Sequence, residues 1–246
     1  MKWNQKFIYP KSSRSLVMGR RHYEIGNDKL PSVTTILSQT QSEEKRKSLA
    51  NWQARVGQHR ADRIRDLSAM RGTSMHTYLE GYIKNQRHLD LTALGQEAGR
   101  MADVIIGSGL GELEDVWGTE VTIHYPGLYA GQTDVVGVYD GQPAIIDFKQ
   151  TNRPKRREWI TDYFEQLGAY CMAHNYVYNT KVQSGVILMC SKDFLFQKFE
   201  ISGREFVRHQ HNFLKKIDQF YKQNADKYQI VPKQNEGPDT KKDEKL

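Results

Sequence analysis

The sequence predicts an α/β protein in which a central mixed sheet is flanked by helices. Hydrophobic residues recur with helical spacing between residues 32 and 107. From residue 117 onwards, three consecutive segments change to the alternating pattern of half-buried strands, and helical and strand patterns follow one another after residue 158. A chain of 246 residues can bury a sizeable core, and it suits one large domain or one domain with an added subdomain.

The N-terminal part begins with short extended pieces at residues 5–30, separated by turn signals. Ser32 is a suitable N-cap for a first helix, because its side chain can accept a hydrogen bond from the first helical turn. The strongly basic residues 43–68 continue as a helix, and residues 71–84 form a further helix after Gly72.

The rest of the chain supplies the sheet and its covering helices. We expect, in order, a helix at 96–107, strands at 117–125, 128–139 and 143–149, a helix at 158–178, strands at 182–190 and 193–201, and a helix at 203–226. We divide the chain into an N-terminal helical extension (1–70), a core (71–230) and a charged tail (231–246). The tail has no apolar anchor, so it is predicted to be disordered.

Composition narrows the classes of partner. The net charge of +7, with 36 lysines and arginines, favours an anionic partner, although part of this excess can be solvated surface. No apolar run approaches the roughly 20 residues that span a bilayer, so we expect no membrane contact. The N-terminus lacks the apolar region of a secretory signal and is not a convincing transit peptide. We therefore expect a monomer in the cytoplasm of a bacterium or an infected host cell, rather than in the mitochondrial matrix.

The stretch GQTDVVGVYDGQPAIIDFKQT (131–151) reads as a β-hairpin with two acids on facing strands. Asp140-Gly141 is its turn, because both central positions of a type I′ turn need a positive φ. Counting outward places Asp134 opposite Asp147, where like charges are destabilising, and Lys149 on the same face. A divalent cation such as Mg²⁺ or Mn²⁺ between the carboxylates would make the arrangement favourable. The alternative is an inert, solvated acid pair that Lys149 neutralises.

Two neighbouring features point to the same place. Glu120 faces Asp134 if the preceding hairpin has a three-residue loop at 126–128, and it misses by one position if the loop has two residues. His76 and Glu80 are four residues apart, so they share one face of a helix. A helical histidine is a metal ligand or a structural residue, and both readings remain open here.

These motifs together resemble the PD-(D/E)XK nuclease superfamily. The resemblance rests on G-x-x-D at 131–134, D-F-K at 147–149, the later helix with Gln166-Leu167-Gly168-Ala169-Tyr170, and the order αβββαβ. The upstream RGTSMHTYLE with its histidine narrows it to the RecB-type exonuclease branch. Within that branch the mitochondrial genome maintenance exonucleases and small phage-encoded relatives are most similar, also through PSVTTILSQT at 31–40. The proline of the superfamily's name is absent, since Thr133 precedes Asp134.

The resemblance implies a restriction-endonuclease-like core and a metal-dependent DNA exonuclease that works in replication, repair or recombination. It implies one or two Mg²⁺ or Mn²⁺ ions held by His76, Asp134, Asp147 and the carbonyl of Phe148, with Glu80 as a further candidate. Glu120 is a candidate ligand from its position in the strand. Lys149 would be the catalytic lysine, and Gln166 and Tyr170 would contact the scissile phosphate or a water. Some relatives hold an iron–sulfur cluster on four cysteines, whereas this chain has two, so we expect no cluster.

Basic and aromatic residues are placed where a nucleic acid would pass. We expect Arg71, Arg153, Lys155, Arg156 and Arg157 to contact the phosphate backbone. Trp52, Tyr78 and Trp159 could stack on bases, with core packing as the alternative for each. The resemblance favours ends of single-stranded DNA over duplex or flap ends. A structure-specific or restriction-like endonuclease is the second hypothesis, and a non-catalytic nucleic-acid-binding module on a nuclease fold is the third.

Overall fold

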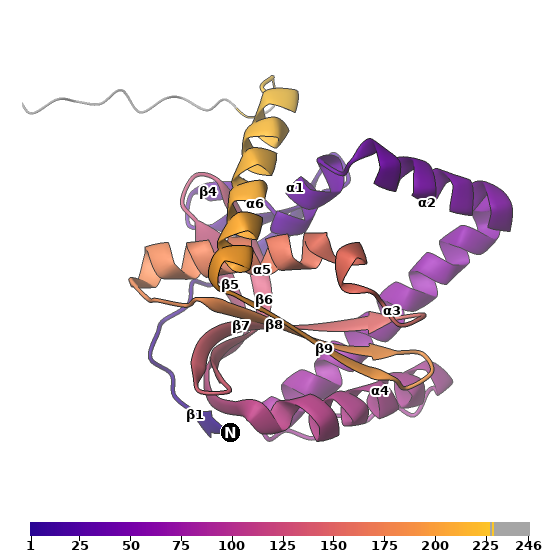
Figure 1. Cartoon of the computed structure of the whole chain (residues 1–246), viewed down its shortest axis with the longest axis vertical. Helices are drawn as coiled ribbons and strands as arrows, with labels where there is room; N and C mark the ends of the chain where they lie inside the picture. Colours follow the sequence, from indigo (N-terminus) through magenta and orange to yellow (C-terminus); the bar gives the residue numbers. More distant parts are fainter. Residues whose placement is uncertain (227, 229–246) are drawn as a thin grey trace, which may run out of the picture.

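The computed structural model describes residues 1–226 and residue 228 of the chain. In this part of the chain, helices cover both faces of a six-stranded mixed sheet, and a three-stranded sheet lies beside it (Figure 1). The α/β architecture expected from the sequence is confirmed. The tail at residues 231–246 lies outside the described residues. Within the described part, no helix combines the length and apolar character needed to cross a membrane.

The helices and strands follow the order expected from the sequence. The helices are α1 (Val33–Gln39), α2 (Glu43–Val56), α3 (Gln58–Ile83), α4 (Ala93–Gly109), α5 (Thr161–Tyr178) and α6 (Gly203–Gln223), with short 3₁₀ turns η1 (Leu110–Glu112) and η2 (Arg157–Trp159). The strands are β1 (Lys2–Trp3), β2 (Ser13–Val17), β3 (Arg20–Ile25), β4 (Asp28–Pro31), β5 (Leu113–Tyr125), β6 (Tyr129–Tyr139), β7 (Gln142–Thr151), β8 (Ser184–Ser191) and β9 (Phe196–Ser202).

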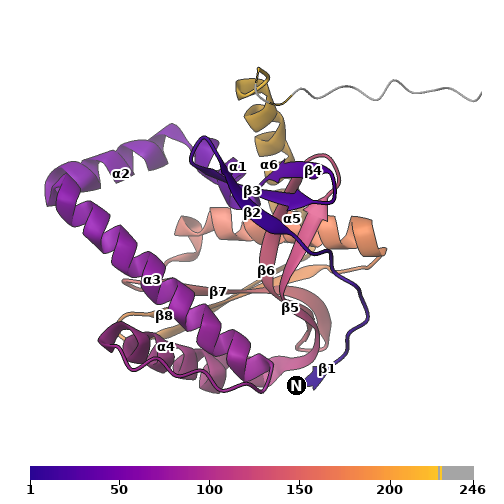
Figure 2. The same cartoon turned by 180° about the vertical axis from the view of Figure 1, so that it is seen from behind.

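The large sheet has the strand order β1-β5-β6-β7-β8-β9, in which β7 and β8 are parallel and β6 is antiparallel to both of its neighbours. Because side chains alternate along a strand, β7 contributes to two separate hydrophobic clusters. Ile145 packs in the cluster that contains α5 and α6, whereas Ala144, Ile146 and Phe148 pack in the cluster that contains α3 and α4. The sheet is therefore the middle layer between two pairs of helices (Figures 1 and 2).

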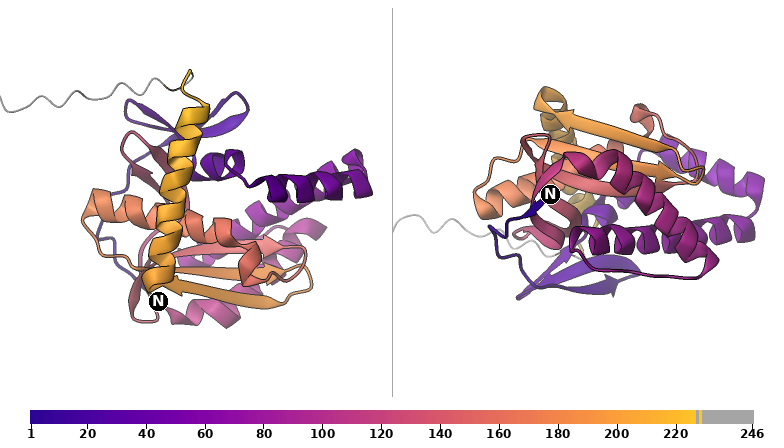
Figure 3. Two further views of the ribbon diagram at one scale, coloured as in Figure 1. Left: turned by 45° about the horizontal axis from the view of Figure 1, so that its top comes forward. Right: turned by 90° about the horizontal axis from the view of Figure 1, so that it is seen from below.

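The helical break in the N-terminal part lies at a different residue from the one expected. Gly57 separates α2 from α3 with a φ of +83°, a conformation that favours glycine. The basic stretch 43–68 therefore forms two helices, and α3 continues without interruption through Gly72. The division of the chain at residue 70 stays a prediction, and that boundary lies within α3. Helix α2 and the first half of α3 project from the core as a V-shaped pair (Figures 2 and 3).

The extended pieces of the N-terminal part form the antiparallel sheet β2-β3-β4. Ser32 ends this sheet and caps α1, as expected, by accepting a hydrogen bond from the backbone of Thr35 at 3.0 Å. Ser32 also forms an isolated parallel bridge with Ala130 of β6. This bridge fixes the small sheet to the strand that carries Asp134.

Candidate active site

The hairpin β6–β7 has the expected turn, and its two strands have the expected register over the half that lies nearest the turn. Asp140 and Gly141 have φ values of +46° and +71°, as a type I′ turn requires. Val136 pairs with Ile145, and the ladder between the two strands ends at Val135 and Ile146. Beyond this point β6 remains paired with β5 and β7 with β8, so the two strands diverge.

Asp134 lies at this divergence, so the expected ladder pair of Asp134 and Asp147 does not form. Asp134 instead accepts a hydrogen bond from the backbone N–H of Phe148 at 2.6 Å through its Oδ2. Both carboxylates are buried, with 6% and 2% of their surface exposed, and both line one cleft of about 360 Å³. The divergence of β6 and β7 thus replaces direct cross-strand repulsion with a polar pocket between the strands.

Glu120 reaches the same pocket from β5. Tyr125 pairs with Tyr129, so the hairpin loop has three residues, and the register on either side of Glu120 places it opposite Asp134. Its φ of +52° is uncommon for a residue other than glycine. Gln132 donates hydrogen bonds to both the backbone carbonyl and the carboxylate of Glu120, which holds the side chain in this orientation.

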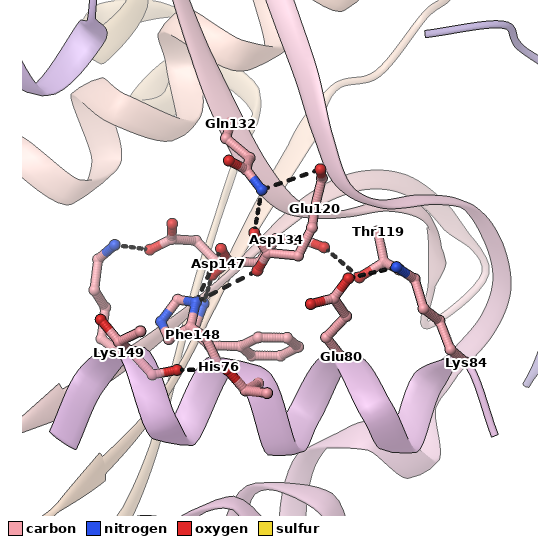
Figure 4. A network of polar contacts seen from close by, with 12 residues as sticks. His76, Glu80, Lys84, Thr119, Glu120, Gln132, Asp134, Asp147, Phe148 and Lys149 are labelled. Carbon is pink, nitrogen blue, oxygen red and sulfur yellow. Dashed lines mark hydrogen bonds and ion pairs between the residues drawn. The ribbon is translucent and has the colours of Figure 1, made fainter. Parts of the chain in front are cut away.

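His76 of α3 completes a group of possible metal ligands (Figure 4). Its Nδ1 lies 3.2 Å from Asp134 Oδ1 and 3.7 Å from Glu120 Oε1. The ligand atoms of His76, Glu120 and Asp134 all lie within 4.8 Å of one another. Imidazole nitrogen and carboxylate oxygen are ligands for divalent cations such as Mn²⁺, and the two oxygen donors also suit Mg²⁺.

The charges of this group shift its pKa values. Burial disfavours a protonated His76, but the Asp134 and Glu120 carboxylates outweigh burial and raise the pKa of His76 to about 10. Burial likewise opposes ionisation of Asp134. The attraction of the neighbouring His76 cation is stronger than this effect of burial, so the pKa of Asp134 is lowered. The pKa of Glu120 is raised, first by burial and then by the Asp134 and Glu80 charges. His76 is therefore the protonated counterion of the acids, and a bound cation would replace its proton.

Lys149 and Asp147 form a buried ion pair beside this group, between Nζ and Oδ2 (Figure 4). Burial raises the pKa of Asp147, and repulsion from the Asp134 charge adds to this effect. Together they exceed the opposing attraction of the Lys149 ammonium, and the pKa of Asp147 rises to about 6. Burial disfavours the ammonium of Lys149, but the Asp147 and Asp134 charges outweigh it, so the pKa of Lys149 lies above its ordinary value. Lys149 is thus a cation at neutral pH, suited to offset negative charge rather than to accept a proton.

Gln166 and Tyr170 lie four residues apart on α5 and face Asp147. Gln166 Nε2 lies 3.4 Å from Asp147 Oδ1 and 3.1 Å from the Tyr170 hydroxyl, and it donates a hydrogen bond to each. The Tyr170 ring occupies the space over Gly131, where a Cβ atom would lie 2.5 Å from its Cε1. Glycine at position 131 therefore permits the close approach of α5 to β6.

Glu80 lies one helical turn from His76 and lines the cleft, but it is paired with Lys84. It does not share the close grouping of ligand atoms that His76, Glu120 and Asp134 form. Asp147 is likewise outside that grouping, because its carboxylate is held by Lys149 and Gln166. The ligand roles of Glu80, Asp147 and the Phe148 carbonyl stay predictions.

Two of the residues that we expected to contact a nucleic acid bind to other residues of the protein. Arg71 is 4% exposed, and its guanidinium donates to Gln150, Glu97 and Asn152, so it is not available to a phosphate. Tyr78 is half-buried, packs against Gly99 and exchanges hydrogen bonds with the backbone of Asp90, as a residue with a packing role does. Charge and aromatic character alone do not separate such residues from surface ones.

The loop after β7 is partly exposed, as expected. Arg153 and Arg156 are exposed, and Arg156 lies 5.2 Å from the ring of Trp159, which is 56% exposed. Lys155 is half-buried, and its backbone is held on both sides by the Gln197 side chain. Arg157 differs from the rest, because it pairs with Glu205 at 2.9 Å and so also fixes the loop to α6.

On the projecting helices, Trp52 is half-buried in α2, a helix without a fully buried residue. Part of the basic charge in this region is neutralised, since Lys45 pairs with Asp162 and Arg65 with Asp62. Trp52 and the exposed basic residues of the region stay candidates for contact with a nucleic acid.

Several cleft residues were missed by sequence reasoning. Arg14, Arg21 and Tyr23 of the small sheet, Ser32 and Thr34 near the start of α1, and Thr73 and Thr77 of α3 line the cleft as well. The two threonines could have been found, because they lie three residues before and one residue after His76 on the same helix. The small sheet carried no comparable signal, since its position over the cleft depends on contacts with β6.

Known proteins resemble this chain in sequence and in fold. No protein-family model matches the chain. The mitochondrial genome maintenance exonuclease 1 of Mus musculus is 29% identical over 174 residues, or 67% of this chain and 50% of that protein. The human protein of the same name is 28% identical over 177 residues, or 67% of this chain and 50% of that protein. The chain thus spans about half the length of the curated relatives it matches.

Among solved structures, a protein from Eubacterium rectale that carries the name of an exonuclease has a TM-score of 0.50. The match covers 66% of this chain and 69% of that one at 12% identity, so it bears on the fold alone. The chain is therefore similar in sequence to the mitochondrial genome maintenance exonucleases, and its fold is similar to that of this solved protein.

Proposed function

We propose that the chain is a divalent-metal-dependent DNA exonuclease that hydrolyses phosphodiester bonds from the ends of single-stranded DNA, in replication, repair or recombination. The observation that supports this most directly is the meeting of His76, Glu120 and Asp134 within 4.8 Å, beside the buried pair of Lys149 and Asp147. The exonuclease names of the sequence relatives favour the same activity.

The donor set fits Mg²⁺ or Mn²⁺. His76, Glu120 and Asp134 would hold one ion, and Asp147 with the Phe148 carbonyl would contribute to the same or a second ion. A bound ion lowers the pKa of a coordinated water and so supplies hydroxide near neutral pH. The pairing of His76 with two carboxylates is the arrangement expected of ligands that exchange a proton for a cation. The absence of an iron–sulfur cluster stays a prediction.

The protein's own groups supply the remaining chemistry. The Lys149 ammonium is held toward the acids and is positioned to offset charge that develops on the scissile phosphate. Gln166 and Tyr170 lie beside Asp147 and can orient a water or a phosphate oxygen by hydrogen bonding. The buried surroundings strengthen each of these electrostatic contacts.

The expected substrate follows the distribution of charge. The exposed Arg55, Arg60 and Arg63 on the projecting helices and the loop with Arg153 and Arg156 offer contacts that track a phosphate backbone without reading bases. The preference for single strands is proposed on the resemblance, since charge alone suits duplex DNA or RNA equally. The cytoplasmic location and the monomeric state stay predictions.

The test is cleavage of end-labelled oligonucleotides, single-stranded and double-stranded, with Mg²⁺, Mn²⁺ or EDTA. We expect cleavage of single strands that requires metal and is lost in Asp134→Asn. A circular single strand should stay intact, because an exonuclease requires an end. Cutting of the circle would favour the endonuclease hypothesis, and metal-independent binding without cleavage would favour the binding module.

A further inference from the structure

A basic surface lies in the same cleft as the acidic group, on the small sheet. Arg14 pairs with Tyr23 across β2 and β3, and Leu16 pairs with Arg21. Since directly paired residues of antiparallel strands share a face and alternate residues of one strand do too, both arginine side chains lie on one face of this sheet. Both line the cleft together with His76, Asp134 and Lys149.

The guanidiniums of Arg14 and Arg21 have no polar partner among the described residues. In the described part of the chain, no carboxylate lies within 4.0 Å of the guanidinium of Arg14 or Arg21, and neither side chain forms a hydrogen bond there. Four carboxylates line the same cleft and are instead paired with His76, Lys84, Lys149 or Gln132. The two arginines therefore stand apart from the acids and retain their full hydrogen-bonding capacity.

The backbone that carries these arginines is fixed to the catalytic strand. The carbonyl of Arg21 accepts hydrogen bonds from the Ser32 N–H at 3.1 Å and from the Thr35 hydroxyl at 3.0 Å. Ser32 in turn bridges to Ala130, four residues before Asp134 on β6. The Arg14 guanidinium lies 5.8 Å from the ring of Tyr23, which is 2% exposed and so does not move aside. The separation of the arginines from the acidic group is therefore set by the fold.

We propose that Arg14 and Arg21 form a binding subsite for one backbone phosphate of the nucleic acid strand, next to the phosphate that the acidic group receives. This inference rests on the proposed function and adds a positioning role for the N-terminal sheet. A guanidinium matches two phosphate oxygens with two parallel N–H donors, and two guanidiniums on one face match a single phosphodiester. They also offset the repulsion between a polyanion and the carboxylates of the cleft.

Binding of a short, fluorescently labelled single-stranded oligonucleotide in EDTA tests the subsite without any need for cleavage. The double variant Arg14→Gln/Arg21→Gln should bind at least about tenfold more weakly, as expected for lost hydrogen bonds between charged groups. The slope of log affinity against log salt concentration should become shallower by about 0.7, the value for one phosphate contact on a single strand. The matched control is Arg20→Gln, because Arg20 is the neighbour on the opposite face of β3 and donates to Gln39 at 2.7 Å. It should bind within about twofold of the wild type.

Two further experiments test which phosphate the two arginines contact and whether the guanidinium shape matters. An Arg14→Lys/Arg21→Lys variant keeps the charge but loses the planar fork, so it should restore the salt dependence without the full affinity. Oligonucleotides with a neutral methylphosphonate at one position at a time should abolish the difference between wild type and the glutamine variant at one or two adjacent positions. A loss of equal size at every position, or one no larger than that of Arg20→Gln, would overturn the proposal.

The outcome is separable from that of the proposed function. A wild-type protein that binds single strands but cleaves none refutes the nuclease assignment, and the comparison of the arginine variants can still be made. A wild-type protein that binds no nucleic acid in EDTA refutes the phosphate subsite, whatever its activity in the presence of metal.

Discussion

Replacing Lys149 with alanine should abolish cleavage while DNA affinity stays close to that of the wild type. The Lys149 side chain is 19% exposed and its Nζ is held at Asp147, so it acts in surroundings with little water. Removing one such preorganised charge donor from an active site lowers rates by about 10²–10³. We therefore expect about 1% of the wild-type rate or less. Binding should persist because the exposed basic residues that supply it lie elsewhere.

The protein should remain folded without Lys149, because the Asp147 carboxylate that loses its partner can take up a proton. Leaving a buried carboxylate unpaired costs about 3–5 kcal/mol when the carboxylate stays ionised. Asp147 can avoid part of this cost, because burial already raises its pKa to about 6 with Lys149 present. At about 1.36 kcal/mol per pKa unit, protonating it at about pH 7.5 costs about 2 kcal/mol. The destabilisation should therefore be capped near this value and should shrink as the pH falls toward 6.

The assays are single-turnover cleavage with Mn²⁺, oligonucleotide binding in EDTA, and urea unfolding at two pH values. The control is Lys198→Ala, which removes a β9 lysine that is paired with Glu112 of η1 and Glu200 and lies away from the cleft. It should leave the cleavage rate unchanged. Cleavage above a few per cent in Lys149→Ala would refute the role of this lysine. A destabilisation that grows as the pH falls would refute the explanation from Asp147.

Three further outcomes follow from the site. The affinity for Mn²⁺, measured by calorimetry, should rise about tenfold per pH unit below pH 10, because His76 must lose its proton to bind the ion, and a flat profile between about pH 7 and 9 would contradict this role. Reversing Lys155 and Arg156 to glutamate should weaken DNA binding and flatten its salt dependence, whereas wild-type values for both would make this loop merely solvated surface. Gly131→Ala should lower the free energy of unfolding by about 1–3 kcal/mol, because its Cβ would overlap the Tyr170 ring, and an unchanged urea midpoint would argue against that contact.

The sequence was sufficient for the parts of the site that local geometry determines. The Asp140-Gly141 turn fixes the register of the hairpin up to Val135, as counting residues outward from the turn predicts. The same kind of count places Glu120 opposite Asp134 only with a three-residue loop, a length that the sequence left open and that the structure shows. The divergence of β6 from β7 could not be counted in this way, because beyond Ile146 β7 is paired with β8, a strand that lies far along the sequence.

The same limit explains the residues that were placed wrongly or missed. Arg71 reads as one more basic residue of a charged stretch, and its burial follows only from its meeting Gln150 and Asn152, some 80 positions along the chain. Arg14 and Arg21 read as ordinary surface residues of short strands until the Ser32–Ala130 bridge places their sheet over the cleft. The helix break at Gly57 is different, because glycine is a local signal for a break and the sequence carries the same signal at Gly72, where α3 continues.

The unbroken course of α3 has a mechanical consequence. The helix runs for 26 residues, or about 39 Å at 1.5 Å per residue, from the projecting V to His76 and beyond. It contains no proline, the residue that most often kinks a helix, and it is continuous through Gly72. Gly57 precedes its first turn and sets the change of direction between α2 and α3. The direction of α2 therefore depends on the backbone at one glycine, whereas His76 and the outer end of α3 belong to one continuous helix.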